Sequence, residues 1–241
     1  MRILLTNDDG VDSEGLVELE AGLRRDHDVW VVAPEHNRSG CAHAVSLSNP
    51  TRVRAIGDRR YACSGSPADC VLISRLGIVP SPIHVVLAGI NHGPNLGTDT
   101  IYSGTAAAAR QAALDGIPAV ALSLYGYREP YDFAPCVEFV SERLGDLMKA
   151  WVPETFVNVN FPRRPAFDGV RSTVPCRRNY RDGMHVHENA RGDRFCFLDG
   201  EIPTAADDAQ SDYQAVVDGH ISVSLIAVHP TSIPIGDGFF V

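Results

Sequence analysis

Short apolar runs alternate with amphipathic segments over the first 161 residues, and this alternation limits the possible folds more than any other feature. Five runs have the length and composition of buried strands, being rich in Val, Ile, Leu and Ala: 2–6, 29–33, 84–88, 119–124 and 155–161. Strands of this kind, separated by helices, favour a parallel sheet that is covered on both faces. The sequence therefore predicts an α/β fold with a doubly wound, mainly parallel sheet.

Helices are predicted between these strands. In the segment 13–25, Ser13 can cap a helix whose Leu16, Leu19 and Leu23 share one face. Ser66, followed by Pro67, opens a second helix that extends to about residue 76. Two further helices are predicted at 106–114 and 135–148, and short β pieces at 45–47, 53–56 and 61–63.

The pattern changes after residue 162. Residues 163–205 contain eight arginines, with turn signals at 182–183 and 192–193 between β-like pieces. These features predict β-hairpins that form a protruding arm, which could be a solvated surface insertion or an oligomer-forming arm. A short helix at 211–218 and a strand at 221–228, which we expect to rejoin the sheet, complete a single predicted domain over 1–241.

Composition excludes several classes of partner. The chain has 21 basic and 30 acidic residues and a net charge of −9, so its mean field repels nucleic acid and anionic membranes. Its six cysteines form no C-x-x-C pair, which suits a reducing compartment. The apolar run at the start is too short for a signal peptide, and no apolar window is long enough to span a bilayer. We therefore expect a soluble, cytoplasmic protein.

Polar side chains follow three of the predicted strands. Asp8 and Asp9 follow the first strand, Ser39 lies in the loop after the second, and Asn91 follows the strand at 84–88. Ligands bind open α/β sheets beyond the carboxyl ends of the strands, where these loops meet. Carboxylate, hydroxyl and amide oxygens suit Mg²⁺, Mn²⁺ or Ca²⁺. The alternative for Asp8 and Asp9 is a turn followed by a helix cap.

An anion site is predicted beside these loops. The residues Ser103, Gly104 and Thr105 lead into the helix at 106–114, where backbone N–H groups and the helix dipole favour phosphate. Hydroxyls of Ser103 and Thr105 would add donors, although an ordinary N-cap explains the same residues. His229 ends the last predicted strand and is either a proton donor at the rim or a structural histidine.

Five blocks of sequence together resemble the survival protein SurE family. They are 2–10, which ends in Asn-Asp-Asp-Gly; 31–40; Gly-Ser-Pro-Ala-Asp-Cys at 65–70; 89–97 with Tyr-Ser-Gly-Thr at 102–105; and 212–223. The resemblance is collinear and covers nearly the whole chain. It implies a Rossmann-like fold, an arm exchanged in homodimers or homotetramers, and a metal-dependent phosphomonoesterase acting on nucleoside 5′- and 3′-monophosphates.

The resemblance also implies the roles of individual residues. Asp8, Asp9, Ser39 and Asn91 match the family's ligands to one divalent ion, Mg²⁺ or Mn²⁺, in each subunit. Asn95 and the stretch 103–105 match its phosphate-contacting loop. One aspartate is expected to orient or deprotonate the attacking water. Two rivals remain open: a haloacid-dehalogenase-type phosphatase that forms a phospho-aspartate, and a nucleotide-binding regulator without turnover.

Overall fold

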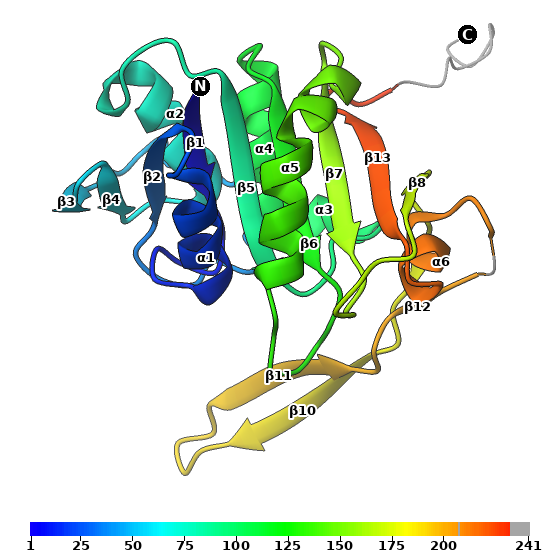
Figure 1. The fold of residues 1–241 in the computed structure, drawn as a ribbon. Coiled ribbons are helices and arrows are strands. Elements are labelled where there is room, and N and C mark those ends of the chain that lie inside the picture. Colours follow the sequence, from blue (N-terminus) through cyan, green and yellow to red (C-terminus); the bar gives the residue numbers. More distant parts are fainter. Residues whose placement is uncertain (207, 232–241) are drawn as a thin grey trace, which may run out of the picture.

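A computed structural model of the chain describes residues 1–206 and 208–231. One nine-stranded sheet runs through it in the order β3-β4-β2-β1-β5-β6-β7-β13-β8 (Figure 1). Its strands are β1 (Arg2–Thr6), β2 (Asp28–Pro34), β3 (Val53–Gly57), β4 (Arg60–Cys63), β5 (Val85–His92), β6 (Ala119–Leu124), β7 (Thr155–Phe161), β8 (Val170–Ser172) and β13 (Ile221–Ala227). The six strands β4, β2, β1, β5, β6 and β7 are parallel, which confirms the predicted doubly wound α/β fold.

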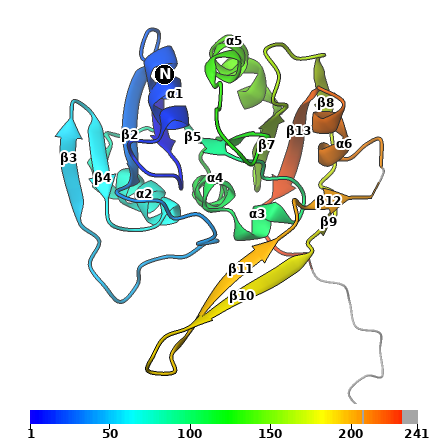
Figure 2. The same cartoon turned by 90° about the horizontal axis from the view of Figure 1, so that it is seen from below.

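Helices cover both faces of this sheet. They are α1 (Glu14–Leu23), α2 (Pro67–Ile73), α3 (Asp99–Tyr102), α4 (Gly104–Leu114), α5 (Ala134–Ala150) and α6 (Asp212–Val217), and a π-helical turn at Ser74–Ile78 follows α2. Seen from below, α1 and α5 lie on one side of the sheet and α2 and α4 on the other (Figure 2). None of the helices in the described ranges is long and apolar enough to cross a membrane.

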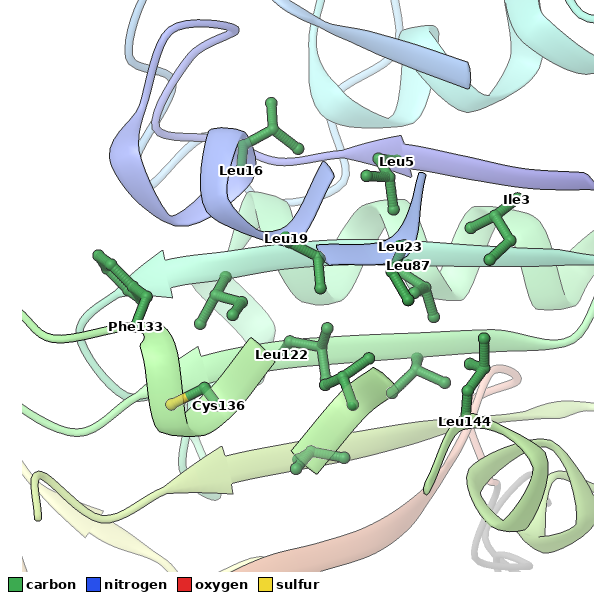
Figure 3. Packing of buried hydrophobic residues seen from close by; sticks show 14 of the residues in the cluster. Ile3, Leu5, Leu16, Leu19, Leu23, Leu87, Leu122, Phe133, Cys136 and Leu144 are labelled. Carbon is green, nitrogen blue, oxygen red and sulfur yellow. The ribbon is translucent and has the colours of Figure 1, made fainter. Parts of the chain in front are cut away.

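Each face of the sheet has its own apolar core. On the α1/α5 face, Leu19 and Leu23 of α1 pack with Leu87 of β5 and Leu122 of β6 (Figure 3). On the other face, Ala106, Ala109 and Ala112 of α4 pack against the small residues of β5 and β6. Alanines let α4 lie close to the sheet. At the start of this helix, Gly104 and Thr105 are hydrogen-bonded to Asp8, which follows β1.

The strand predicted at 84–88 is longer than expected. β5 continues to His92, beyond the predicted end at residue 88, with a register shift against β6 between Ala88 and Asn91. Gly89 permits this course, because its φ is +137° and a Cβ at this position would lie 2.3 Å from the Leu122 carbonyl oxygen. The extension carries Asn91 to the edge of the sheet.

The predicted arm contains a single long hairpin. It is formed by β10 (Asp182–Glu188) and β11 (Arg194–Gly200) and extends away from the sheet (Figure 1). The turn at 192–193 is confirmed, whereas Asp182 and Gly183 begin β10 and form no turn. Two short strands, β9 (Arg178–Asn179) and β12 (Thr204–Ala205), pair at its base. The short strand expected at 45–47 is irregular chain.

The last strand rejoins the sheet in the opposite direction. β13 is antiparallel to β7, and its register pairs Ala227 with Thr155, the first residue of β7. The carboxyl end of β13 therefore lies at the edge of the sheet where the parallel strands begin. Residues 207 and 232–241 of the predicted single domain lie outside the described residues.

Candidate active site

The loops after β1, β2 and β5 meet around a cavity of about 390 Å³ at the carboxyl edge of the sheet. Five residues predicted for the site line it: Asp8, Ser39, Asn91, Asn95 and Ser103. They come from the loop after β1, the loop after β2, and the end of β5 with the segment that follows it up to α4. These parts of the chain meet because parallel strands end at the same edge of the sheet. The backbone N–H of Arg38 donates to the carbonyl oxygen of Asp8 at 2.6 Å and so ties the first two loops together.

Asp8 is the most buried acid of this cavity, with 3% of its surface exposed. The Thr105 hydroxyl donates to Oδ1 at 2.6 Å, and the Gly104 N–H donates to Oδ2 at 3.0 Å. Burial raises the pKa of Asp8 and the charge of Asp9 raises it further, while the hydrogen bond from Thr105 opposes them. Both donors are neutral, so the negative charge of an ionised Asp8 has no cation against it in these contacts.

Asp9 turns toward the end of β5. Its Oδ2 accepts the backbone N–H of His92 at 3.1 Å and lies 3.0 Å from Nδ1 of the same residue. The side-chain hydrogen bond between Nδ1 and Asp9 Oδ2 raises the pKa of His92. His92 also packs edge-on against Tyr131 and Phe133. It was absent from the sequence-based site, and nothing in the pattern around it indicated a contact with Asp9.

Asn91 and Ser39 supply neutral oxygens to the same region. The Asn91 amide nitrogen donates to the Gly93 carbonyl at 2.8 Å, which orients the amide and leaves its oxygen as the other polar atom of the group. The exposed Ser39 has its N–H fixed by Asn37 Oδ1 at 2.8 Å. Both residues line the cavity next to Asp8.

This donor set fits a hard divalent ion. Among the described residues no group of three or more His, Cys, Asp or Glu could hold a metal. The cavity offers the carboxylate of Asp8 together with the hydroxyl of Ser39 and the amide oxygen of Asn91. Asp9 is not among the lining residues, and its Oδ2 is bonded to His92. Such oxygen ligands suit Mg²⁺ and Mn²⁺, and the uncompensated charge of Asp8 is the kind that a cation relieves.

The start of α4 differs from the prediction at two residues, Gly104 and Thr105. Ser103 lines the cavity and caps α4, its Oγ accepting the Ala106 N–H at 2.9 Å. Thr105 is fully buried and its only hydroxyl proton is donated to Asp8. The expected donation from Thr105 to phosphate is therefore wrong for this structure, since the residue positions Asp8. The Gly104 N–H is likewise donated to Asp8.

Asn95 is held rigidly in the wall of the cavity. Its Nδ2 donates to Ser123 Oγ at 2.8 Å and its backbone N–H donates to Asn160 Oδ1 at 2.8 Å. Its carbonyl oxygen accepts from the amides of Asn158 and Asn160 at 2.9 and 3.1 Å. A side chain fixed in this way can present its remaining amide atoms to a ligand without loss of conformational freedom.

Four tyrosines form the outer wall of the cavity and were not predicted for the site: Tyr102, Tyr127, Tyr131 and Tyr180. Tyr102 ends α3, and Tyr180 belongs to the base of the arm. Their rings meet edge to face with centroids 6.3 Å apart. The Tyr180 hydroxyl also donates to Asp99 Oδ1. The residue pair Tyr102 and Tyr180 thus joins the arm to the cavity.

His229 lies far from this cavity. The hydrogen bond from Val228 N to the Glu154 carbonyl places the end of β13 beside the start of β7, at the opposite edge of the sheet. His229 is exposed there. The predicted proton donor is therefore wrong, because the last strand runs opposite to the direction that the prediction required.

Comparison with known proteins identifies a family that matches most of this chain. The family "Survival protein SurE" matches residues 3–182. A protein of Petrotoga mobilis named 5′-nucleotidase SurE is 37% identical, over 96% of this chain and 94% of its own length. A protein of Chelativorans sp. with the same name is 40% identical, over 98% and 97%. The crystal structure of the SurE protein from Aquifex aeolicus matches with a TM-score of 0.84 and 32% identity, over 96% and 95% of the two chains.

Proposed function

The chain belongs to the survival protein SurE family, and from this premise we propose that it is a divalent-metal-dependent 5′-nucleotidase. It hydrolyses nucleoside 5′-monophosphates, and also 3′-monophosphates, to nucleoside and phosphate. Relatives named 5′-nucleotidase SurE that align over nearly the full chain support this activity. The single observation that carries it in the structure is the buried Asp8 at a cavity lined by hard oxygen donors.

One Mg²⁺ or Mn²⁺ per subunit is assigned to Asp8, Asp9, Ser39 and Asn91. When bound, such an ion polarises a phosphate oxygen and lowers the pKa of a coordinated water. Thr105 and Gly104 hold Asp8 in one orientation, and His92 holds Asp9. Because these contacts exist before substrate enters, little reorganisation is needed during the reaction.

The remaining residues of the cavity bind the substrate. Asn95 and Ser103 face the phosphate, and the dipole of α4 contributes positive potential at the start of the helix. One of Asp8 and Asp9 orients or deprotonates the attacking water. We assign no proton donor for the leaving ribose oxygen, since His229 lies at the opposite edge of the sheet.

A phosphate-release panel tests this function. Purified protein is given nucleoside monophosphates and generic phosphate esters, first with EDTA and then with added Mg²⁺ or Mn²⁺. We expect release from AMP only with metal. A trapped phospho-aspartate would instead indicate haloacid-dehalogenase-type chemistry. Stoichiometric AMP binding without phosphate release under Mn²⁺ would indicate a nucleotide-binding regulator.

The arm is assigned to oligomer formation, giving a homodimer or homotetramer. On β11, Phe195, Phe197 and Leu198 expose 52%, 57% and 88% of their surfaces, and on β10 Met184 exposes 58%. A protruding hairpin with this much apolar surface is typical of a segment that another subunit covers. A cytoplasmic location and the absence of nucleic-acid and membrane partners stay predictions from composition.

A further inference from the structure

A second pocket lies beside the candidate active site. It has a volume of about 700 Å³ and shares two wall residues, Gly126 and Tyr127, with the cavity around Asp8. Its walls come from the segment after β6, the segment after β7, and α6. We call it the arginine pocket, because its charged lining residues are Arg128, Arg163 and Arg164, and all of its lining residues are described and none is acidic.

The positive charge of this pocket is only partly neutralised. Arg164 pairs with Asp168 at 2.8 Å. Arg163 donates instead to two neutral acceptors, the carbonyl oxygens of Arg128 and Pro130, at 2.9 and 2.6 Å. These bonds fix its guanidinium in place without cancelling its charge. Three arginines around one hollow, in a chain of net charge −9, favour an anionic ligand.

A fourth arginine supports the shared wall from behind. The side chain of Arg178 is fully buried, and its Nη2 donates to the Tyr127 hydroxyl at 2.7 Å. Its guanidinium lies 5.1 Å from the ring centroid of Tyr213, another wall residue. Asp99 lies 3.3 Å from its Nε. Arg178 therefore fixes two aromatic rings of the pocket.

Apolar and aromatic surface forms the rest of the pocket. Ile202, Val217 and Tyr127 all line it, and they expose 55%, 43% and 38% of their surfaces. Tyr125 and Tyr127 meet edge to face with ring centroids 5.8 Å apart. A hollow that combines guanidinium groups with aromatic rings matches a ligand with phosphates at one end and a planar base at the other.

We propose that the arginine pocket binds a nucleotide with two or more phosphates, at a site separate from the cavity of the proposed reaction. Three guanidinium groups match more negative charge than a phosphate monoester carries. The shared residue Tyr127 places this ligand next to the cavity around Asp8. The inference goes beyond the proposed nucleotidase activity and does not depend on it.

Calorimetric titration of the full chain with ATP in EDTA tests the proposal. Without a divalent ion the carboxylates of Asp8 and Asp9 repel phosphate, so binding under these conditions reports the arginine pocket. We expect one ATP per chain. The double variant Arg128→Gln/Arg164→Gln is expected to weaken binding at least about tenfold, since two charged contacts are removed.

Matched variants decide where the ATP binds. Arg143→Gln removes one positive charge from an exposed arginine on α5 and is matched to the single variant Arg128→Gln, and Asp8→Asn changes the other cavity, so neither is expected to weaken binding. Absence of ATP binding by the wild type, or equal binding by the double variant, would overturn the proposal. If the double variant unfolds, the single Arg128→Gln variant replaces it, because Arg128 is exposed.

Titration with tripolyphosphate distinguishes binding of a whole nucleotide from binding of its phosphate groups alone. If the aromatic wall contacts a base, ATP binds at least several-fold more tightly than tripolyphosphate, because stacking adds about 1 kcal/mol or more. Equal affinities would overturn the assignment to a nucleotide and leave a site for bare polyphosphate. Loss of AMP hydrolysis is measured in a separate assay with metal, so the two functions fail independently.

Discussion

The Thr105 hydroxyl donates a hydrogen bond to Oδ1 of Asp8 across 97 positions of sequence, at 2.6 Å. Thr105 lies in the first turn of α4 and Asp8 in the loop after β1, and both are buried. The bond fixes the carboxylate of Asp8 at the cavity where we assign the metal. Because Thr105 donates to Asp8, substituting it tests the position of Asp8 and not a direct contact with phosphate.

Replacing Thr105 by Val keeps the shape of the side chain and removes the hydroxyl. A hydrogen bond to a charged group contributes about 1.5–3 kcal/mol, so we expect weaker Mn²⁺ binding and a loss of roughly tenfold or more in kcat/KM. Thr105→Ser retains a hydroxyl and should recover most of both. Calorimetric Mn²⁺ titration with kinetics on AMP measures them, and wild-type metal affinity in Thr105→Val would refute this role.

Asp9→Asn tests the assignment of the second carboxylate. The substitution removes one negative charge from the proposed metal site, and we expect a loss of about 3 kcal/mol or more of transition-state stabilisation, or roughly 100-fold in kcat/KM. Asp12→Asn is the control, since its side chain is 89% exposed in the same loop region. Phosphate release from AMP under saturating Mn²⁺ is the measurement. If folded Asp9→Asn protein hydrolyses AMP as fast as wild type, Asp9 is not a ligand.

Much of the fold and part of the site could be predicted from local sequence. The five apolar runs identified the central strands because buried parallel strands need continuous apolar residues. The positions of Asp8, Ser39 and Asn91 followed, since loops after parallel strands meet at one edge. No contact between these loops had to be known in advance to predict that they meet at one cavity.

Contacts between distant segments could not be predicted in this way. The bonds from Thr105 to Asp8 and from His92 to Asp9 join residues 97 and 83 positions apart, and no local pattern encodes them. The direction of the last strand was missed as well. Residues 221–224 alternate as Ile-Ser-Val-Ser, which is more typical of an antiparallel strand than of a buried parallel one. The misplacement of His229 follows from that missed direction.

A single charge on the arm should disrupt the proposed oligomer. Leu198 is 88% exposed on β11, and covering such a side chain in an interface would contribute about 1.5–3 kcal/mol, whereas a buried carboxylate would oppose assembly. We expect Leu198→Asp to reduce the molar mass measured by light scattering. Leu76→Asp, at a 71% exposed leucine after α2, is the control. An unchanged molar mass in Leu198→Asp would argue against the arm as an interface.

The ion pairs of Asp28, at the start of β2, provide a test of how the stability of the fold depends on pH. Asp28 Oδ2 accepts from Arg2 at 2.8 Å and Oδ1 accepts from Arg59 at 2.7 Å. Burial alone would raise the pKa of Asp28, but the hydrogen bond from Arg2 and the charges of Arg59 and Arg2 hold it below its usual range. A pKa that is lower in the folded than in the unfolded chain stabilises the fold above the unfolded value, near pH 4, and this contribution is lost as the pH falls through the folded value.

Asp28→Asn should therefore destabilise the protein at pH 7 and have a smaller effect in acid. Because the side chain is 34% exposed, solvent screening limits the expected change in the free energy of unfolding to about 1 kcal/mol. Urea unfolding at pH 7 and below pH 4 measures it, with Asp58→Asn, at an 84% exposed carboxylate, as the control. A difference between wild type and variant that grows in acid would contradict the expected sign.

Gly104 gives the sharpest test of how closely α4 approaches Asp8. A Cβ at this position would lie 2.8 Å from Cβ of Asp8, 2.9 Å from its Oδ2 and 3.0 Å from Sγ of Cys41. These distances are shorter than ordinary carbon contacts, so either the helix or the carboxylate must move. Gly104→Ala should therefore weaken Mn²⁺ binding and reduce AMP hydrolysis by roughly tenfold or more, since small displacements of catalytic groups are costly.

Gly145→Ala is the matched substitution in α5. Its Cβ would meet nothing within 4 Å, and alanine in a helix is more stable than glycine by about 1 kcal/mol. We expect this variant to melt at the same or a higher temperature and to keep full activity. Because both changes add one methyl group to a helix, a loss confined to Gly104→Ala would come from the displaced Asp8. Equal activity of the two variants would mean that the position of Asp8 does not control the reaction.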